Sequence, residues 1–173
     1  MNNEKDNVYD LVEDFYAHDE GWNTLLRQEY AEGFLRMEAW KGKKNSDLYR
    51  SWDNLTMLCL YLGSAETFLG DMNADDFIDC IAWCGRNISE FTPDYKNTQD
   101  FLETCDGLFK YLKGKNAISN DMVPGTAAEI LLQEGKMNII LPDGSFDEAN
   151  AERAWNATPD IPAKIFLNIG EGL

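Results

Sequence analysis

Four cysteines are the first candidates for chemistry in this sequence, because thiolates bind zinc and act as nucleophiles. Cys80 and Cys84 lie one helical turn apart, but structural zinc sites usually combine two closely spaced pairs, and Cys59 and Cys105 supply no second pair. All four fall on the apolar faces of predicted helices, where a free cysteine behaves as a small hydrophobic residue. We therefore expect reduced core thiols, with no bound metal and no other cofactor.

A calcium site is the second candidate. The run Asp71-x-Asn73-x-Asp75 is similar to the first half of a calcium loop, in which several oxygen ligands lie on a tight turn. The second half departs from the pattern, because Asp76 stands where the loop needs glycine and Ala82 where it needs a bidentate glutamate. We expect Asn73 to cap a helix instead.

Proton transfer has few candidates. His18 is the only histidine, and its neighbours Asp19 and Glu20 could raise its basicity. Carboxylate pairs such as Glu29 and Glu32 are so frequent in this acidic chain that their spacing indicates nothing. No nucleophile elbow, phosphate loop or dinucleotide fingerprint is present. We predict no catalytic residue and no enzymatic activity; the alternative is an enzyme of an unrecognised class with titratable groups converging in a deep pocket.

A mixed aromatic and basic segment is the candidate interaction site. Aromatic residues and arginine are enriched in protein interfaces, and tryptophan is frequent among the residues that dominate binding energy. The sequence places Trp40 beside three lysines, followed by a tyrosine and an arginine. A purely structural role for Trp40 is the alternative. The predicted patch consists of Trp40, Lys41, Lys43, Lys44, Tyr49 and Arg50.

Charge limits the classes of partner. The chain of 173 residues has 31 acidic and 15 basic residues, which gives a net charge of -16. A field of this sign repels phosphate backbones, so we do not expect direct nucleic-acid binding. The predicted function is a non-catalytic binding or adaptor module that engages a protein partner through an acidic surface. The alternative is an acidic nucleic-acid mimic that blocks the basic groove of a DNA- or RNA-handling protein.

No apolar run approaches the length of about 18 residues needed to cross a membrane. The first residues, Met-Asn-Asn-Glu-Lys-Asp, have neither the basic nor the apolar part of a signal peptide. We expect a cytoplasmic protein that has no contact with a membrane.

Apolar residues at spacings of three and four predict that helices position these candidates. Ser51 is the expected N-cap of the third helix, Gly85 the expected end of the fourth, and Pro93 the expected first residue of the fifth. The helices are predicted over residues 6–17, 23–41, 51–70, 73–85 and 93–114.

The pattern changes after residue 118. A capping box at Thr126 and Glu129 predicts a short helix over 126–134, and a further helix is expected over 146–157. Residues 137–141 and 163–169 are candidate strands. The predicted fold class is mainly α: an orthogonal helical bundle over 1–120, followed by a small α+β lobe over 121–173. If the chain is the front part of a longer protein, the last strand is an open edge, through which a homodimer could also form.

Residues 46–122 carry a family pattern. Residues 72–78 look like an acidic turn at the start of a second helix, and Thr98, Phe101, the run 108–113 and Asn120 follow the spacing of later helices. This stretch resembles the SAM-like core-binding domain of phage integrases, the tyrosine recombinases. The resemblance implies an orthogonal four-helix module, which in that family clamps DNA beside a catalytic domain.

The chemistry of that family does not transfer with the resemblance. Its catalytic domain has no counterpart here, and His18 lies outside the similar region. The matching stretch is acidic except at Lys110, Lys113 and Lys115, whereas DNA clamping needs several phosphate contacts from basic residues. The resemblance therefore predicts the fold and not the activity.

Overall fold

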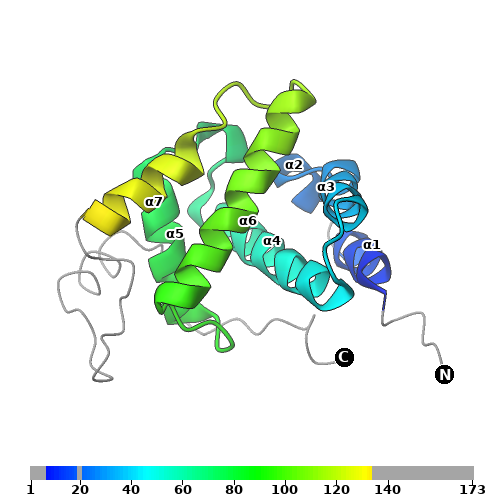
Figure 1. Cartoon of the computed structure of the whole chain (residues 1–173), viewed down its shortest axis with the longest axis horizontal. Coiled ribbons are helices and arrows are strands. Elements are labelled where there is room, and N and C mark those ends of the chain that lie inside the picture. The colour runs from blue at the N-terminus through cyan, green and yellow to red at the C-terminus, as the bar shows by residue number, and fades with distance from the viewer. Residues whose placement is uncertain (1–6, 19–20, 134–173) are drawn as a thin grey trace.

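The computed structural model describes residues 7–18 and 21–133, and this part of the chain is a bundle of α-helices with no strand. Its mainly α class confirms the sequence prediction. Figure 1 shows the helices in chain order. They are α1 (Val8–His18), α2 (Trp22–Leu25), α3 (Gln28–Trp40), α4 (Asn45–Ala65), α5 (Ala74–Asn87), α6 (Tyr95–Gly114) and α7 (Val123–Gln133), with a 3-10 turn η2 (Leu69–Asp71) after α4.

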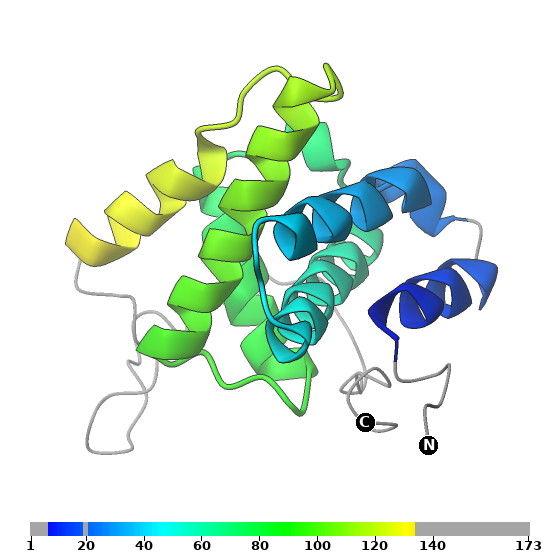
Figure 2. The same ribbon diagram turned by 45° about the vertical axis from the view of Figure 1, so that its right-hand side comes forward.

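The helix α4 lies at the centre of the bundle. It contacts α1, α2 and α3 on one side and α5 and α6 on the other. Figures 1 and 2 show α4 and α6 crossing steeply rather than running parallel. Trp52, Leu55, Leu58 and Leu62 of α4 are fully buried. Burial of these large apolar side chains makes α4 a major contributor to the hydrophobic stabilisation of the bundle.

The start of α5 follows the sequence prediction. The Asn73 side chain accepts a hydrogen bond from the Asp76 backbone N–H at 2.9 Å, and the Asp76 carboxylate accepts one from the Asn73 N–H at 2.9 Å. This reciprocal capping box satisfies two backbone donors that a helix start leaves unpaired. Asn73 is therefore the predicted N-cap.

The single helix expected over 23–41 is two helices. Leu26 is extended (φ -148°, ψ 115°) and buried, so it leaves the helix between α2 and α3. Its carbonyl accepts a hydrogen bond from the Tyr16 hydroxyl, and the Asn23 side chain accepts one from the Gln28 N–H at 2.9 Å. A hydrogen bond from the preceding helix and a local side-chain cap thus stabilise a break that the apolar period does not reveal.

The predicted start of the third helix at Ser51 is wrong. α4 begins at Asn45 after Lys44, and Ser51 lies buried within it. The Ser51 hydroxyl accepts a hydrogen bond from Lys43 Nζ at 2.8 Å, so a tertiary contact satisfies its polar group. The helix also ends at Ala65, before a left-handed Glu66 (φ 53°), rather than at Gly70.

Gly85 does not end α5, which continues to Asn87. A side-chain Cβ at residue 85 would lie 2.6 Å from Pro93 Cγ, so the glycine is needed for close packing. Pro93 is buried there and precedes α6, whose N-cap is Asp94, which accepts a hydrogen bond from the Asn97 N–H at 2.9 Å. The prediction that Pro93 opens the helix was wrong by two residues.

The helix predicted at the start of the C-terminal lobe belongs to the bundle. It forms α7, which packs on α5 and α6, and Ala127 and Leu131 bury their side chains there. The helical body therefore extends past the boundary expected at residue 120, and the structure does not support the α+β lobe. The two predicted strands, the predicted helix 146–157 and the proposed dimer edge lie outside the described residues.

Candidate functional site

The predicted interaction patch lies at the corner between α3 and α4. Trp40 is the last residue of α3, Lys41 is its C-cap and Lys44 is the residue before α4. Tyr49 and Arg50 follow within the first two turns of α4. The fold thus brings together residues from two helices and the turn that joins them.

A glycine turn sets the geometry of this corner. Gly42 has φ +101°, a left-handed conformation that a residue with a side chain adopts only with strain. The Gly42 N–H donates to the Ala39 carbonyl and the Lys43 N–H to the Glu38 carbonyl, each at 3.0 Å. This pair of hydrogen bonds is a Schellman motif, which ends α3 directly after Trp40. The chain then reverses into α4, and Trp40 is left at the tip.

The six patch residues divide into two groups. Trp40, Lys41, Lys44 and Arg50 are exposed. Lys43 is half-buried, and its Nζ lies 2.7 Å from Glu38 Oε2 and 2.8 Å from Ser51 Oγ. Tyr49, the sixth residue of the predicted patch, is also half-buried and packs against the hydrophobic core. Lys43 and Tyr49 therefore support the corner, while the other four residues can meet a partner.

Trp40 differs sharply from the other tryptophans in the described part of the chain. Trp52 and Trp83 are fully buried, and Trp22 stacks on Phe15 with ring centroids 5.0 Å apart. Trp40 is 88% exposed. Its indole contributes almost nothing to the core, so the structural alternative considered for this residue is not supported. Exposure of so large an apolar side chain beside three cations is typical of an interface.

A half-buried carboxylate, that of Asp53, lies close to this patch. Burial and, to a smaller extent, the nearby Glu90 raise the pKa of Asp53 to about 6, against the opposing effect of the Arg50 guanidinium. Asp53 Oδ1 accepts no hydrogen bond from any described residue. Arg50 is therefore near enough to Asp53 to stabilise its charged form, while its own side chain is exposed to solvent.

The cysteines are confirmed as free core thiols. Cys59, Cys80, Cys84 and Cys105 are all buried and unpaired by disulfides. Burial raises the pKa of Cys59 to about 12 and those of Cys80 and Cys105 well above the usual value, so these thiols are protonated at neutral pH. Within residues 7–18 and 21–133 no group of histidine, cysteine and carboxylate side chains has a metal-binding arrangement.

The remaining sequence candidates do not converge. His18 ends α1 with an exposed ring, and its Nδ1 lies 2.8 Å from the Asp14 carbonyl oxygen, an arrangement that closes the helix. Asn73 and Asp76 are engaged in the capping box, while Asp71 and Asp75 are exposed. Asp19 and Glu20, the expected neighbours of His18, lie outside the described residues. Among the residues that are described, neither place gathers the groups that proton transfer or calcium binding requires.

Searches of protein-family models, curated proteins and solved structures find no match to this chain. The resemblance of residues 46–122 to the core-binding domain of phage integrases therefore stays a prediction. None of the described helices has the length and apolar character needed to cross a membrane.

The structure also shows a groove that the sequence interpretation missed. The α6–α7 groove runs between these two antiparallel helices and has a volume of about 340 Å³. Tyr95, Met122 and Leu132 line it and are 46%, 62% and 53% exposed. They are three of the five large apolar side chains exposed in the described part of the chain. Only the pairing of α6 with α7 brings them together.

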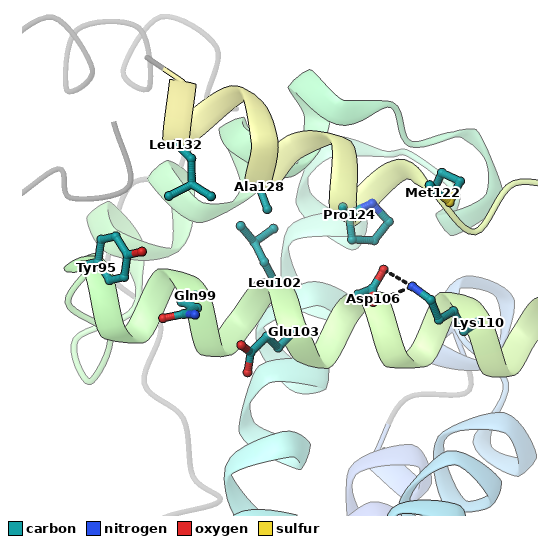
Figure 3. A pocket seen from close by; sticks show the side chains of 11 residues that line it. Tyr95, Gln99, Leu102, Glu103, Asp106, Lys110, Met122, Pro124, Ala128 and Leu132 are labelled. Carbon is teal, nitrogen blue, oxygen red and sulfur yellow. Dashed lines mark hydrogen bonds and ion pairs between the residues drawn. The ribbon is translucent and has the colours of Figure 1, made fainter. Parts of the chain in front are cut away.

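Polar residues occupy one side of this groove. Gln99, Glu103, Asp106 and Lys110 project from α6, and Asp106 and Lys110 form an ion pair. Figure 3 shows Leu102 pointing toward α7 near Ala128, while the ion pair lies toward the Met122 end. The groove thus has an apolar strip along α7 and a polar edge along α6. This geometry suits an amphipathic occupant.

Proposed function

We propose that this protein is a non-catalytic binding module that engages a protein partner through its acidic exterior and its exposed Trp40 patch. The observation that carries the proposal is the 88% exposure of Trp40 at the tip of the α3–α4 corner. An exposed tryptophan can bury a large apolar area against a partner, and its own protein does not have to rearrange first. Hot spots of protein interfaces are enriched in tryptophan and arginine, and this corner presents both.

The charge pattern indicates the chemistry of the partner. Lys41, Lys44 and Arg50 surround Trp40 with positive charge, whereas the chain as a whole has a net charge of -16. A partner surface complementary to this pattern has an apolar pocket for Trp40, carboxylates at the edge of that pocket, and basic residues farther out. A partner of uniform charge would meet repulsion either at the patch or around it, so the pattern favours specificity.

Neither alternative from the sequence gains a specific observation. A nucleic-acid mimic needs carboxylates in rows on one face, and the exposed acidic residues are spread over α1, α3, α5, α6 and α7. An enzyme needs a pocket with converging titratable groups. The α6–α7 groove instead has an apolar strip and an internal ion pair. The Trp40 patch therefore supports the binding module best.

The proposal is tested by affinity capture with the tagged full chain from its native lysate. Trp40→Ala is compared with Phe68→Ala, which truncates another exposed aromatic residue, 56% exposed, away from the patch. Removal of a central tryptophan weakens an interface by about 2 kcal/mol or more, which is roughly thirtyfold in affinity. We expect Trp40→Ala to lose the partner and Phe68→Ala to retain it.

Repeating the affinity capture at low and high salt tests the contribution of the charged residues. Contacts from Lys41, Lys44 and Arg50 weaken as salt is raised, so recovery of the partner should fall at high salt. Both variants should unfold at the wild-type temperature, because neither truncation opens the core. Equal capture by wild type and Trp40→Ala would contradict the proposal.

A further inference from the structure

We propose that the α6–α7 groove is an intramolecular docking site for residues 137–141 of the same chain. This inference goes beyond the proposed function and does not depend on the Trp40 patch. The segment reads Met-Asn-Ile-Ile-Leu and contains no charged residue. It begins four residues after the end of α7 at Gln133, and Leu132 of that helix lines the groove. The candidate occupant is thus tethered at the edge of the site.

The tether favours this occupant over a separate molecule. A short flexible linker holds its two ends at an effective concentration in the millimolar range. Residues 133–136 reach at most about 14 Å when extended, which is sufficient to turn back over a helix pair whose axes lie about 8–10 Å apart. A free peptide or second copy would need a high concentration to compete with a segment held so close.

The lengths of groove and segment agree. Met122, which directly precedes α7, and Leu132 mark the two ends of the apolar strip, and at the rise of a helix their ten-residue separation is about 15 Å. Five residues in an extended conformation cover about 17 Å. If Met137 lies at the Leu132 end of the groove, Leu141 therefore reaches the Met122 end. In this direction Asp143 arrives near Lys110, which has the opposite charge.

The sequence of the segment matches one apolar strip. Successive side chains of an extended segment point to opposite sides, so Met137, Ile139 and Leu141 share one side and Asn138 and Ile140 share the other. The continuous apolar side meets the strip formed by Leu132, Ala128 and Met122. The mixed side, which includes an asparagine, faces solvent. Burial of the exposed groove side chains supplies the driving force.

Photo-crosslinking in the full chain tests this placement. A benzoylphenylalanine replaces Gln99, an exposed groove residue on α6, and crosslinked peptides are identified by mass spectrometry at low protein concentration. The control replaces Glu13 on α1, which Figure 2 shows at the opposite end of the molecule from α7. We expect intrachain crosslinks to residues 137–141 from position 99 and none from position 13. Crosslinks only to a second copy, or none to residues 137–141, would overturn the proposal.

Paired variants in the full chain test the side that docks. Ile139→Asp places a charge against the apolar strip and should lower the intrachain crosslink yield about tenfold, since the lost burial is worth more than 1.4 kcal/mol. Ile140→Asp makes the same change on the outward side and should leave the yield within about twofold. Circular dichroism confirms that both variants keep the helical fold. Wild-type yields for both, or equal losses in both, would reject the docked arrangement.

Discussion

Lys43 Nζ lies 2.7 Å from Glu38 Oε2, and this ion pair spans the Gly42 turn between α3 and α4. The two side chains are only 31% and 17% exposed, and Glu38 Oε1 has no hydrogen-bond partner among the described residues. The pair therefore uses one of the three adjacent lysines to hold the corner, while Lys41 and Lys44 remain exposed beside Trp40. The fold of this corner therefore uses Lys43, whereas Lys41 and Lys44 stay available for the binding that we propose.

Lys43→Ala should lower the free energy of unfolding by about 2 kcal/mol, because it leaves the Glu38 carboxylate buried without a counter-charge. Lys44→Ala removes an exposed cation and should change stability by less than about 0.5 kcal/mol. Urea denaturation of the two variants measures both values. Equal stabilities would show that the ion pair contributes nothing.

Gly42→Ala should destabilise the protein by about 1 kcal/mol, because φ +101° forces a side chain into the disfavoured left-handed region. Gly114→Ala is the matched control. Its backbone does not require a positive φ, no heavy atom of another part of the described chain lies within 4 Å of the added methyl group, and it ends α6. Thermal unfolding should place Gly114→Ala at or above wild type and Gly42→Ala below it. The reverse order would refute the turn assignment.

Asp53 should make stability fall as pH rises from about 4 to 6. Burial raises the pKa of Asp53 from 3.8 to about 6 in the folded protein, so between these values the folded state holds a proton that the unfolded state has released. The folded state is then favoured at the lower pH. Above pH 6 both states are ionised and the penalty stays constant.

Comparison of wild type with Asp53→Asn isolates this effect from other carboxylates, since asparagine does not titrate. Between pH 4 and 6.5 the wild type should lose about 1–3 kcal/mol of unfolding free energy relative to the variant. Urea titrations at several pH values give the difference. Parallel profiles for the two proteins would show that the pKa of Asp53 is not raised.

The four cysteines should be inert in the native protein. Their burial and the raised pKa values of Cys59, Cys80 and Cys105 keep the thiols protonated and out of reach of reagents. A chromogenic disulfide reagent should therefore label the native protein only at the rate at which it unfolds locally or globally. In denaturant the reagent should label all four cysteines. Ser89→Cys, at an exposed position, should react at once in the folded state. Rapid labelling of the wild type would contradict this packing.

Local signals were sufficient for much of the helical architecture. The apolar period predicted the central helices, and the residue type of Asn73, followed by the acidic residues of the first turn, predicted an N-cap that the structure confirms. The structure adds the reciprocal hydrogen bonds with Asp76. Such features depend on residues three or four apart, which a helix brings together whatever surrounds it. The burial of the four cysteines follows from the same period.

The errors arose where a distant contact decides the conformation. Gly85 has the residue type of a helix end, but Pro93 packs against it and α5 continues. Ser51 has the residue type of an N-cap, but Lys43 binds its hydroxyl inside α4. In both cases a tertiary contact outweighs a local preference of about 1 kcal/mol.

The sequence by itself determined a mainly helical, acidic protein and a mixed patch around Trp40. Only the tertiary structure decided that Trp40 is exposed, that Lys43 turns toward Glu38, and that Tyr95 and Leu132 line one groove. Period and charge are properties of neighbouring residues and can be read along the chain. Exposure and grooves depend on which helix faces are left uncovered after packing, and packing is a property of the whole bundle.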